Sequence, residues 1–134
     1  MSALIALQKA MVEALNADAT LTSLIGAGKV FDDVSPGIRP PYLVLTSATA
    51  SDWSTGTEDG EELRFEIDAW SPERGRKSVA LIADAAIAAI KQIASIDAPW
   101  RLVNLRHVST AFDRDPQTEY HHVRIAFRAV IEPA

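Results

Sequence analysis

Cysteine is absent from this sequence of 134 residues, which removes two means of stabilising a small domain. Without thiols the chain forms neither a disulfide framework nor a thiolate zinc site. The absence of cysteine also fits a reducing compartment. Stability must then come from an apolar core. The 48% hydrophobic residues suffice for that core, and the length fits one domain over residues 1–134.

An excess of positive charge is also missing. The 13 Lys and Arg residues are outnumbered by 18 Asp and Glu residues, for a net charge of −5. A dedicated nucleic-acid binder needs a basic footprint, so this class is excluded, although DNA can still pass an acidic protein without binding to it. No apolar run approaches the ~20 residues that span a bilayer, and segment 1–15 carries Lys9 and Glu13. We therefore expect no membrane partner and no signal peptide.

The motifs of common enzyme classes are missing as well. There is no Gly-x-Ser-x-Gly nucleophile elbow and no Walker loop, and Gly26–Lys29 follows a helical pattern that it is expected to stop. His121 and His122 are adjacent on a predicted strand and would point to opposite faces, which with His107 leaves too few ligands for a metal. The sequence therefore predicts no catalytic residue, no cofactor, no metal and no enzymatic activity.

Apolar residues at helical spacing predict a helix at the amino end of the chain and another in its middle. The first covers Met1–Ala17, and Asp18 is expected to cap a short second helical turn that ends at Gly26. The central helix is expected to use Ser71-Pro72 as its cap and first turn and to be regular from Lys77. Its core-facing residues are Val79, Ile82, Ala86, Ile90 and Ile93, and it ends within residues 95–99.

β-branched and aromatic residues predict four long strands, over residues 42–49, 61–70, 101–112 and 119–131. Val30-Phe31 is a candidate for a further short strand. Residues 51–60 are polar and predict a mobile hairpin loop, and residues 113–118 predict a turn. The expected fold is α+β with two layers, in the order α-β-β-α-β-β. It has a mainly antiparallel four-stranded sheet and two helices packed on one face.

The strand over residues 61–70 alternates regularly between apolar and charged side chains. One side carries Leu63, Phe65, Ile67 and Ala69, and the other carries Glu62, Arg64, Glu66 and Asp68. The simplest interpretation of the charged row is the wet face of a half-buried sheet, because a catalytic site needs two carboxylates in a cleft. If this strand lies beside the last one, Glu66 or Asp68 is expected to pair with Arg124 or Arg128.

Two further features each have two interpretations. The cluster Arg74–Lys77 stands at a helix start, where cations oppose the helix dipole. It is either a solvated first turn or a contact for an acidic partner, such as the loop Asp52–Glu62 of a neighbouring copy. Trp53 lies in a polar loop, and it either folds back on its own domain or serves as an interface anchor.

Four segments together resemble the tail terminator, or tail completion, proteins of long-tailed phages and gene transfer agents. They are LIALQKAMVEALNAD followed by LTSLIG, the strand opening RPPYLVL, the segment RFEIDAWSPERGRKSVALIADAAIAAI, and YHHVRIAFRAVIEP behind RDPQT. The resemblance spans roughly residues 1–131 and depends most on the strand that ends in Trp-Ser before a helix. None of these segments is a catalytic motif.

The resemblance implies a structural virion component. Such proteins form a hexameric ring that caps the head-proximal end of the tail tube and joins it to the head-side connector or stopper in the neck. DNA passes through the lumen only transiently, and assembly takes place in the bacterial cytoplasm. The expected partners are therefore other copies of the chain, the tail tube protein and the head-side connector.

A closed ring requires two different, complementary patches on each copy. The candidate contact residues for a neighbouring copy or the tube are Asp52, Trp53, Glu58, Asp59, Glu61, Arg74, Arg76, Lys77, Arg124 and Arg128. One alternative is a small α+β enzyme or ligand-binding domain, which should contain a pocket with converging polar groups. The other is a different neck component, such as a stopper.

Overall fold

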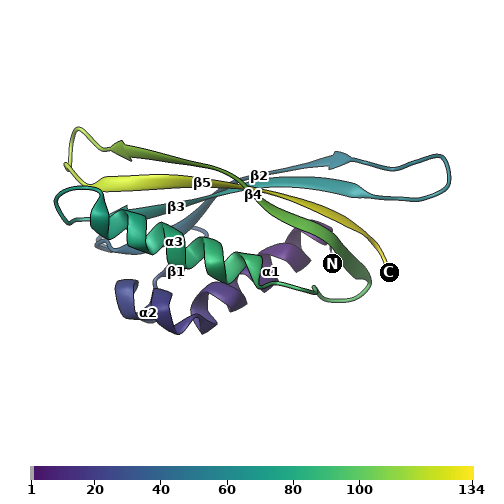
Figure 1. The fold of residues 1–134 in the computed structure, drawn as a ribbon, viewed down its shortest axis with the longest axis horizontal. Coiled ribbons are helices and arrows are strands. Elements are labelled where there is room, and N and C mark those ends of the chain that lie inside the picture. Colours follow the sequence, from purple (N-terminus) through teal and green to yellow (C-terminus); the bar gives the residue numbers. More distant parts are fainter. Residues whose placement is uncertain (1) are drawn as a thin grey trace.

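A twisted sheet with helices on only one of its faces organises the chain (Figure 1). The computed structural model describes residues 2–134. Its elements are α1 (Ala3–Ala17), α2 (Ala19–Ile25), β1 (Val30–Phe31), β2 (Tyr42–Asp52), β3 (Glu61–Ser71), α3 (Lys77–Lys91), β4 (Trp100–Arg114) and β5 (His121–Pro133). The strand order is β1-β2-β3-β5-β4, in which β1 is parallel to β2 and all other neighbours are antiparallel.

The predicted α+β class is confirmed, but four antiparallel strands and two helices were too few. The short strand at Val30–Phe31 is present and adds a parallel fifth strand beside Leu43. The turn after Asp18 is a complete helix, α2, because the Asp18 carboxylate accepts a hydrogen bond from the Leu21 N–H (2.8 Å). Gly26, with a φ of 91°, ends this helix as expected. The sheet is therefore mixed and covered by three helices.

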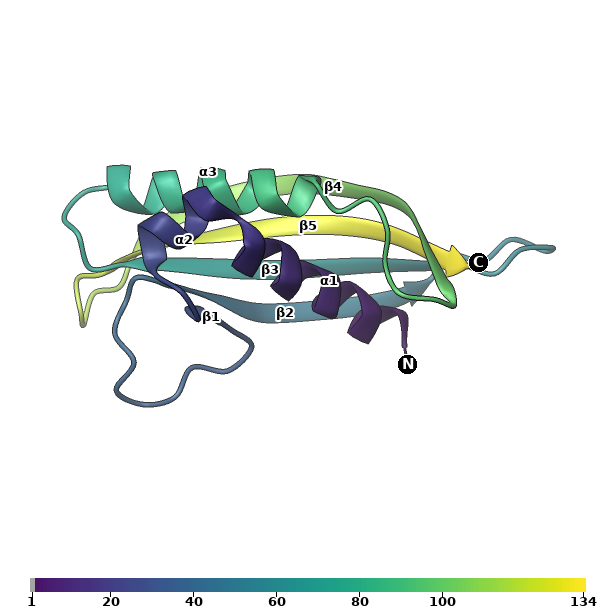
Figure 2. The same ribbon diagram turned by 90° about the horizontal axis from the view of Figure 1, so that it is seen from below.

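The core lies between the helices and the covered face of the sheet. Helix α1 lies on the β2 side of this face and α3 runs along β5 and β4 (Figure 2). The largest fully buried side chains include Leu7, Leu15, Leu63, Ile67, Ile82, Ile90, Ile125, Phe127 and Ile131. The apolar face predicted for β3 is confirmed, since its four apolar residues are buried. The opposite face is less wet than predicted, because only Arg64 is exposed, Glu62 and Glu66 are half-buried and Asp68 is buried. No helix among residues 2–134 is long and apolar enough to cross a membrane.

Helix α3 starts at Lys77, where the sequence predicted its regular part, but the predicted first turn over Ser71-Pro72 does not form. Gly75 adopts a φ of 78°, which is not a helical conformation, so regular helix begins only after it, at Lys77. The Ser71 hydroxyl therefore does not cap α3. It accepts a hydrogen bond from the Glu73 N–H at 3.2 Å and contacts the Ser78 hydroxyl at 3.0 Å, so it closes the loop before α3 instead.

Helix α3 also ends earlier than predicted, at Lys91. The N–H groups of Gln92 and Ile93 bond to Ala89 and Ile90, three residues back, which tightens the last turn and stops the helix. Of the five predicted core residues, Val79, Ile82, Ala86 and Ile90 are buried inside the helix. Ile93 lies beyond its end and is partly buried against the core.

Both hairpins are longer than predicted. Strand β4 continues through Asp113 and Arg114, which the sequence placed in a turn but which pair with His122 and His121 of β5. Strand β2 likewise continues to Asp52, so the connection to β3 contains only residues 53–60. The sequence underestimated these lengths because exposed, polar strand ends carry little hydrophobic pattern.

Candidate assembly surface

The β2–β3 hairpin extends beyond the helices as an arm, whose tip, residues 53–60, lies at one end of the long axis (Figure 1). Hydrogen bonds within the tip join Trp53 N–H to Gly60 O (2.9 Å) and Thr55 N–H to Glu58 O (2.8 Å). The predicted loop is thus internally hydrogen-bonded. Carboxylates gather at and beside the tip, at Asp52, Glu58, Asp59 and Glu61. The Ser54 hydroxyl donates a hydrogen bond to the Asp52 carboxylate and lowers the pKa of Asp52.

Trp53 folds back on its own domain, which is one of the two interpretations that the sequence allowed. Its ring lies 5.9 Å from the guanidinium carbon of Arg128, a cation–π arrangement that holds it against its own domain. Yet 54% of its surface remains exposed. A large, fixed and exposed aromatic side chain beside an arginine has the composition of an interface hot spot.

Three exposed cations stand together where the β3–α3 loop meets the helix: Arg74 and Arg76 lie in the loop and Lys77 begins α3, beside the exposed Glu73. They are called the basic loop below. None of them forms an ion pair with the residues that the structure describes. This basic loop lies at the end of the long axis opposite the arm tip (Figure 1). The chain therefore has an acidic arm tip and, at the opposite end, three cations without an ion-pair partner among the described residues.

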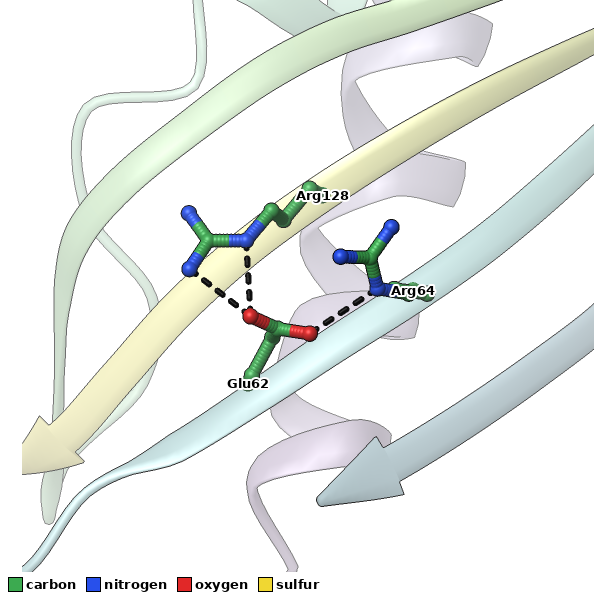
Figure 3. A network of polar contacts seen from close by, with 3 residues as sticks. All are labelled: Glu62, Arg64 and Arg128. Atoms are coloured by element: carbon green, nitrogen blue, oxygen red, sulfur yellow. Dashed lines mark hydrogen bonds and ion pairs between the residues drawn. The ribbon is translucent and has the colours of Figure 1, made fainter. Parts of the chain in front are cut away.

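Arg128, in contrast, is bound within its own chain (Figure 3). Its Nε and Nη2 atoms lie 2.8 and 2.7 Å from one oxygen of Glu62, and Arg64 Nε lies 2.9 Å from the other. The hydrogen bond from Arg128, followed by that from Arg64, lowers the pKa of Glu62. The predicted pairing of Arg128 with Glu66 or Asp68 is wrong, because the register places Arg128 opposite Arg64 and within reach of Glu62.

The predicted pairing of Arg124 is confirmed. Arg124 Nε lies 3.6 Å from Glu66 and 3.5 Å from Asp68, across the β3–β5 boundary on the helix-free face. Asp68 is only 5% exposed, and burial raises its pKa although the Arg124 charge opposes the shift. Arg124 and Arg128 thus each contact carboxylates of their own chain across the β3–β5 boundary, while the side chain of Arg124 remains 55% exposed.

An aromatic row that sequence reasoning missed crosses one end of the helix-free face. The Trp70 ring stacks on His122 with centroids 4.4 Å apart, Tyr42 lies 6.5 Å from Trp70, and Phe31 lies 6.0 Å from Tyr42. Each of these residues stands near the end of a strand. Only the strand order β1-β2-β3-β5 makes them neighbours, so no local pattern could have found them.

A groove of about 240 Å³ between α1 and β2 tests the enzymatic alternative. It is lined by apolar side chains that include Leu4, Leu7, Met11 and Leu45, with Gln8, Asp32 and Glu66 among its polar members. The carboxyl groups with shifted pKa values lie elsewhere. Within residues 2–134 no three His, Asp or Glu side chains are grouped so that they could hold a metal. The groove suits apolar contact better than proton transfer.

Comparisons with known proteins point to a structural protein of a virion. In the solved virion of a native gene transfer agent (GTA) particle, one chain is 28% identical to this one, with 98% of both chains covered and a TM-score of 0.79. No curated protein matches the sequence. The family model described as tail completion protein gp17 matches residues 9–132. The chain therefore belongs to the tail completion protein gp17 family, whose members are structural components of the phage tail and neck.

Proposed function

We propose that this chain is a virion component that forms a hexameric ring at the head-proximal end of a tail tube. The ring caps the finished tube and joins it to the head-side connector, and DNA passes through its lumen without lasting contact. The net charge of −5 suits this passage, since a basic lumen would retain phosphates. Family membership and the likeness to a chain of a gene transfer agent virion support the proposal.

One structural observation supports a closed ring of copies. The acidic arm tip and the basic loop lie at opposite ends of the long axis (Figure 1). They are two different, complementary patches, which is the requirement for a heterologous contact between copies in a closed ring. An isologous pair would instead require one patch to complement itself.

The candidate residues divide into two groups in this proposal. Asp52, Glu58, Asp59 and Glu61 at the tip, together with Trp53, and Arg74, Arg76 and Lys77 in the basic loop contact a neighbouring copy or the tube. Arg124 and Arg128 contribute first to the sheet, because carboxylates of their own chain pair with them, and Arg128 also supports Trp53.

Negative-stain electron microscopy of the protein mixed with its tail tubes tests this function. We expect ring-shaped density at one tube end with the wild type, and bare tubes when Arg74, Arg76 and Lys77 are all replaced by Glu. The matched control carries Arg39→Glu and Lys91→Glu, two exposed cations outside the basic loop. Bare tubes with the wild type would overturn the terminator function. Capped tubes with the triple variant would overturn only the role of the basic loop.

A further inference from the structure

We propose that the two open edges of the sheet pair with each other between copies, so that β2 of one copy accepts β4 of the next. The sheet would then continue across each subunit boundary. This inference depends on the proposed function as a ring, but it places the contact between copies at the edges of the sheet. Copies that lie side by side in the same orientation bring arm tips beside arm tips, so in this arrangement the arm tip and the basic loop are left for the tube and the head-side partner.

The edge of β2 is open over half of its length. Strand β1 pairs only with Leu43 and Val44, and no described strand lies beyond Thr46–Asp52 (Figure 2). The N–H of Trp53 points towards β3, because it bonds to Gly60 O. Backbone groups alternate in direction along an antiparallel strand, so the N–H and C=O groups of Ala48, Ala50 and Asp52 point away from β3, towards the open edge. These donors and acceptors form a template for an added strand.

The open edge of β2 also lacks the usual protection. Edge strands normally avoid unwanted pairing through lysine, proline or bulges. Residues 47–51 have the sequence SATAS, which is uncharged and without proline, and the single irregularity of β2 lies before them, between Leu45 and Ser47. An unprotected edge is expected where pairing is part of assembly.

The strand directions identify β4 as the occupant. The order β2-β3-β5-β4 is antiparallel throughout, so the two edge strands run in opposite directions. A second copy placed alongside in the same orientation therefore brings its β4 antiparallel to β2, with the helices of both copies on the same side. The contact joins opposite edges of the sheet, so it is heterologous, as a ring requires.

Strand β4 has the surface that such a contact would cover. No described strand pairs with its outer side, and Val103, Val108 and Phe112 are each about half exposed. Bulges at Val103 and Val108 bend the strand but leave regular runs of backbone over residues 104–107 and 109–114. Arg106 of this strand has no ion-pair partner among the described residues, which complements the acidic end of β2.

The groove between α1 and β2 fits the same arrangement. It opens beside residues 45–48, where the uncovered stretch of β2 begins. Side chains on the helix side of an added strand would enter it. Phe112 pairs with the buried Val123, which places it on the helix side of β4, and it is 43% exposed. It is the large apolar side chain of β4 suited to this groove.

Disulfide mapping tests the pairing directly, because the chain has no cysteine of its own. Copies with Ser51→Cys, on the helix-free face, are mixed with copies carrying one cysteine on the same face of β4, at Asn104, Arg106 or Ser109. Cysteines at Leu105 and Thr110, on the helix side, are the controls. Within one chain β2 and β4 are three strand spacings apart, about 14 Å, too far for a disulfide.

In tube-bound rings, we expect disulfide dimers between a Ser51→Cys copy and a copy with a cysteine on the helix-free face of β4. The control variants Leu105→Cys and Thr110→Cys should form no such dimers. This alternation is the signature of strand pairing, which a merely nearby surface would not give. Dimers formed by Ser51→Cys copies alone would indicate pairing of β2 with β2 and overturn the inference. A complete absence of mixed dimers in rings that form normally would also overturn it.

A second variant separates this inference from the proposed function. Ala50→Lys places a charge on the open edge of β2, and Ala88→Lys places the same charge on the exposed side of α3. We expect the first variant to fold with an unchanged unfolding temperature but leave tubes bare, and the second to cap them. If the wild type and both variants cap tubes, the edge contact is wrong and the terminator function stands. If the wild type caps none, the proposed function fails.

Discussion

Two carboxylates on the helix-free face, Asp68 and Glu62, are in opposite electrostatic situations. Burial raises the pKa of Asp68, whereas hydrogen bonds from Arg128 and Arg64 lower the pKa of Glu62. The sequence predicted both residues on this face, but their difference arises from the register of β3 against β5. Glu62 faces two guanidinium groups at short distance, while Asp68 meets one, at 3.5 Å, and is covered by its neighbours.

Replacing Asp68 by Asn is expected to stabilise the monomer at neutral pH. Because its pKa in the fold lies above the ordinary 3.8, the ionised form costs stability at pH 7, and the neutral amide removes this cost. We expect the free energy of unfolding to rise. The gain should shrink as the pH falls through the raised pKa, since the wild-type carboxyl then becomes protonated. Urea titrations at neutral and acidic pH measure it, and a loss of stability at pH 7 would contradict it.

Replacing Glu62 by Gln should have the opposite effect. A pKa below the ordinary 4.5 means that ionised Glu62 stabilises the fold fully above that pH and loses its contribution as the pH falls through the lowered value. The variant should therefore unfold at a lower temperature than the wild type at pH 7 and at nearly the same temperature at about pH 2. Calorimetry across this range checks the prediction, and a pH-independent difference would show that the charge is not responsible.

At the scale of elements, short capped segments depend on single hydrogen bonds. Helix α2 has only seven residues, and its start depends on the bond from Leu21 N–H to the Asp18 carboxylate. We expect Asp18→Ala to lower the free energy of unfolding by about 1 kcal/mol, because the N–H of Leu21 loses its acceptor. Asp18→Asn keeps an acceptor oxygen and should retain most of the stability. Equal losses in both variants, measured by urea titration, would exclude capping as the cause.

The hydrophobic periodicity of the sequence identified the long helices and strands. It did not predict the chain where the backbone conformation depends on a single residue. The alternation of Leu63, Phe65, Ile67 and Ala69 correctly predicted the core face of β3, since this pattern has a single solution in a half-buried sheet. Ser71-Pro72 matched a helix start, but the positive φ of Gly75 delayed α3 to Lys77. A cap motif competes with backbone conformation, and sequence alone does not reveal which one prevails.

At the scale of the whole molecule, the proposed function gives the arm tip a role in assembly, while its exposed residues lie outside the core. Replacing residues 54–59 by Asn-Gly keeps the Trp53–Gly60 pair as the end of a two-residue hairpin while removing Glu58 and Asp59. The unfolding temperature should change little, because residues 53–59 are exposed. Tube capping should be lost. Calorimetry and electron microscopy of the same preparation measure both effects, and capped tubes would exclude the acidic tip as a contact.

The sequence by itself determined the α+β class, the covered face of the sheet and the family, because hydrophobic periodicity and order along the chain carry that information. It also placed the acidic and basic clusters. Only the tertiary structure decided that β3 lies between β2 and β5, that Arg128 binds Glu62, and that the two charged clusters lie at opposite ends. These facts depend on strand order and register, which are set by contacts between residues far apart in the chain and leave no local pattern to read.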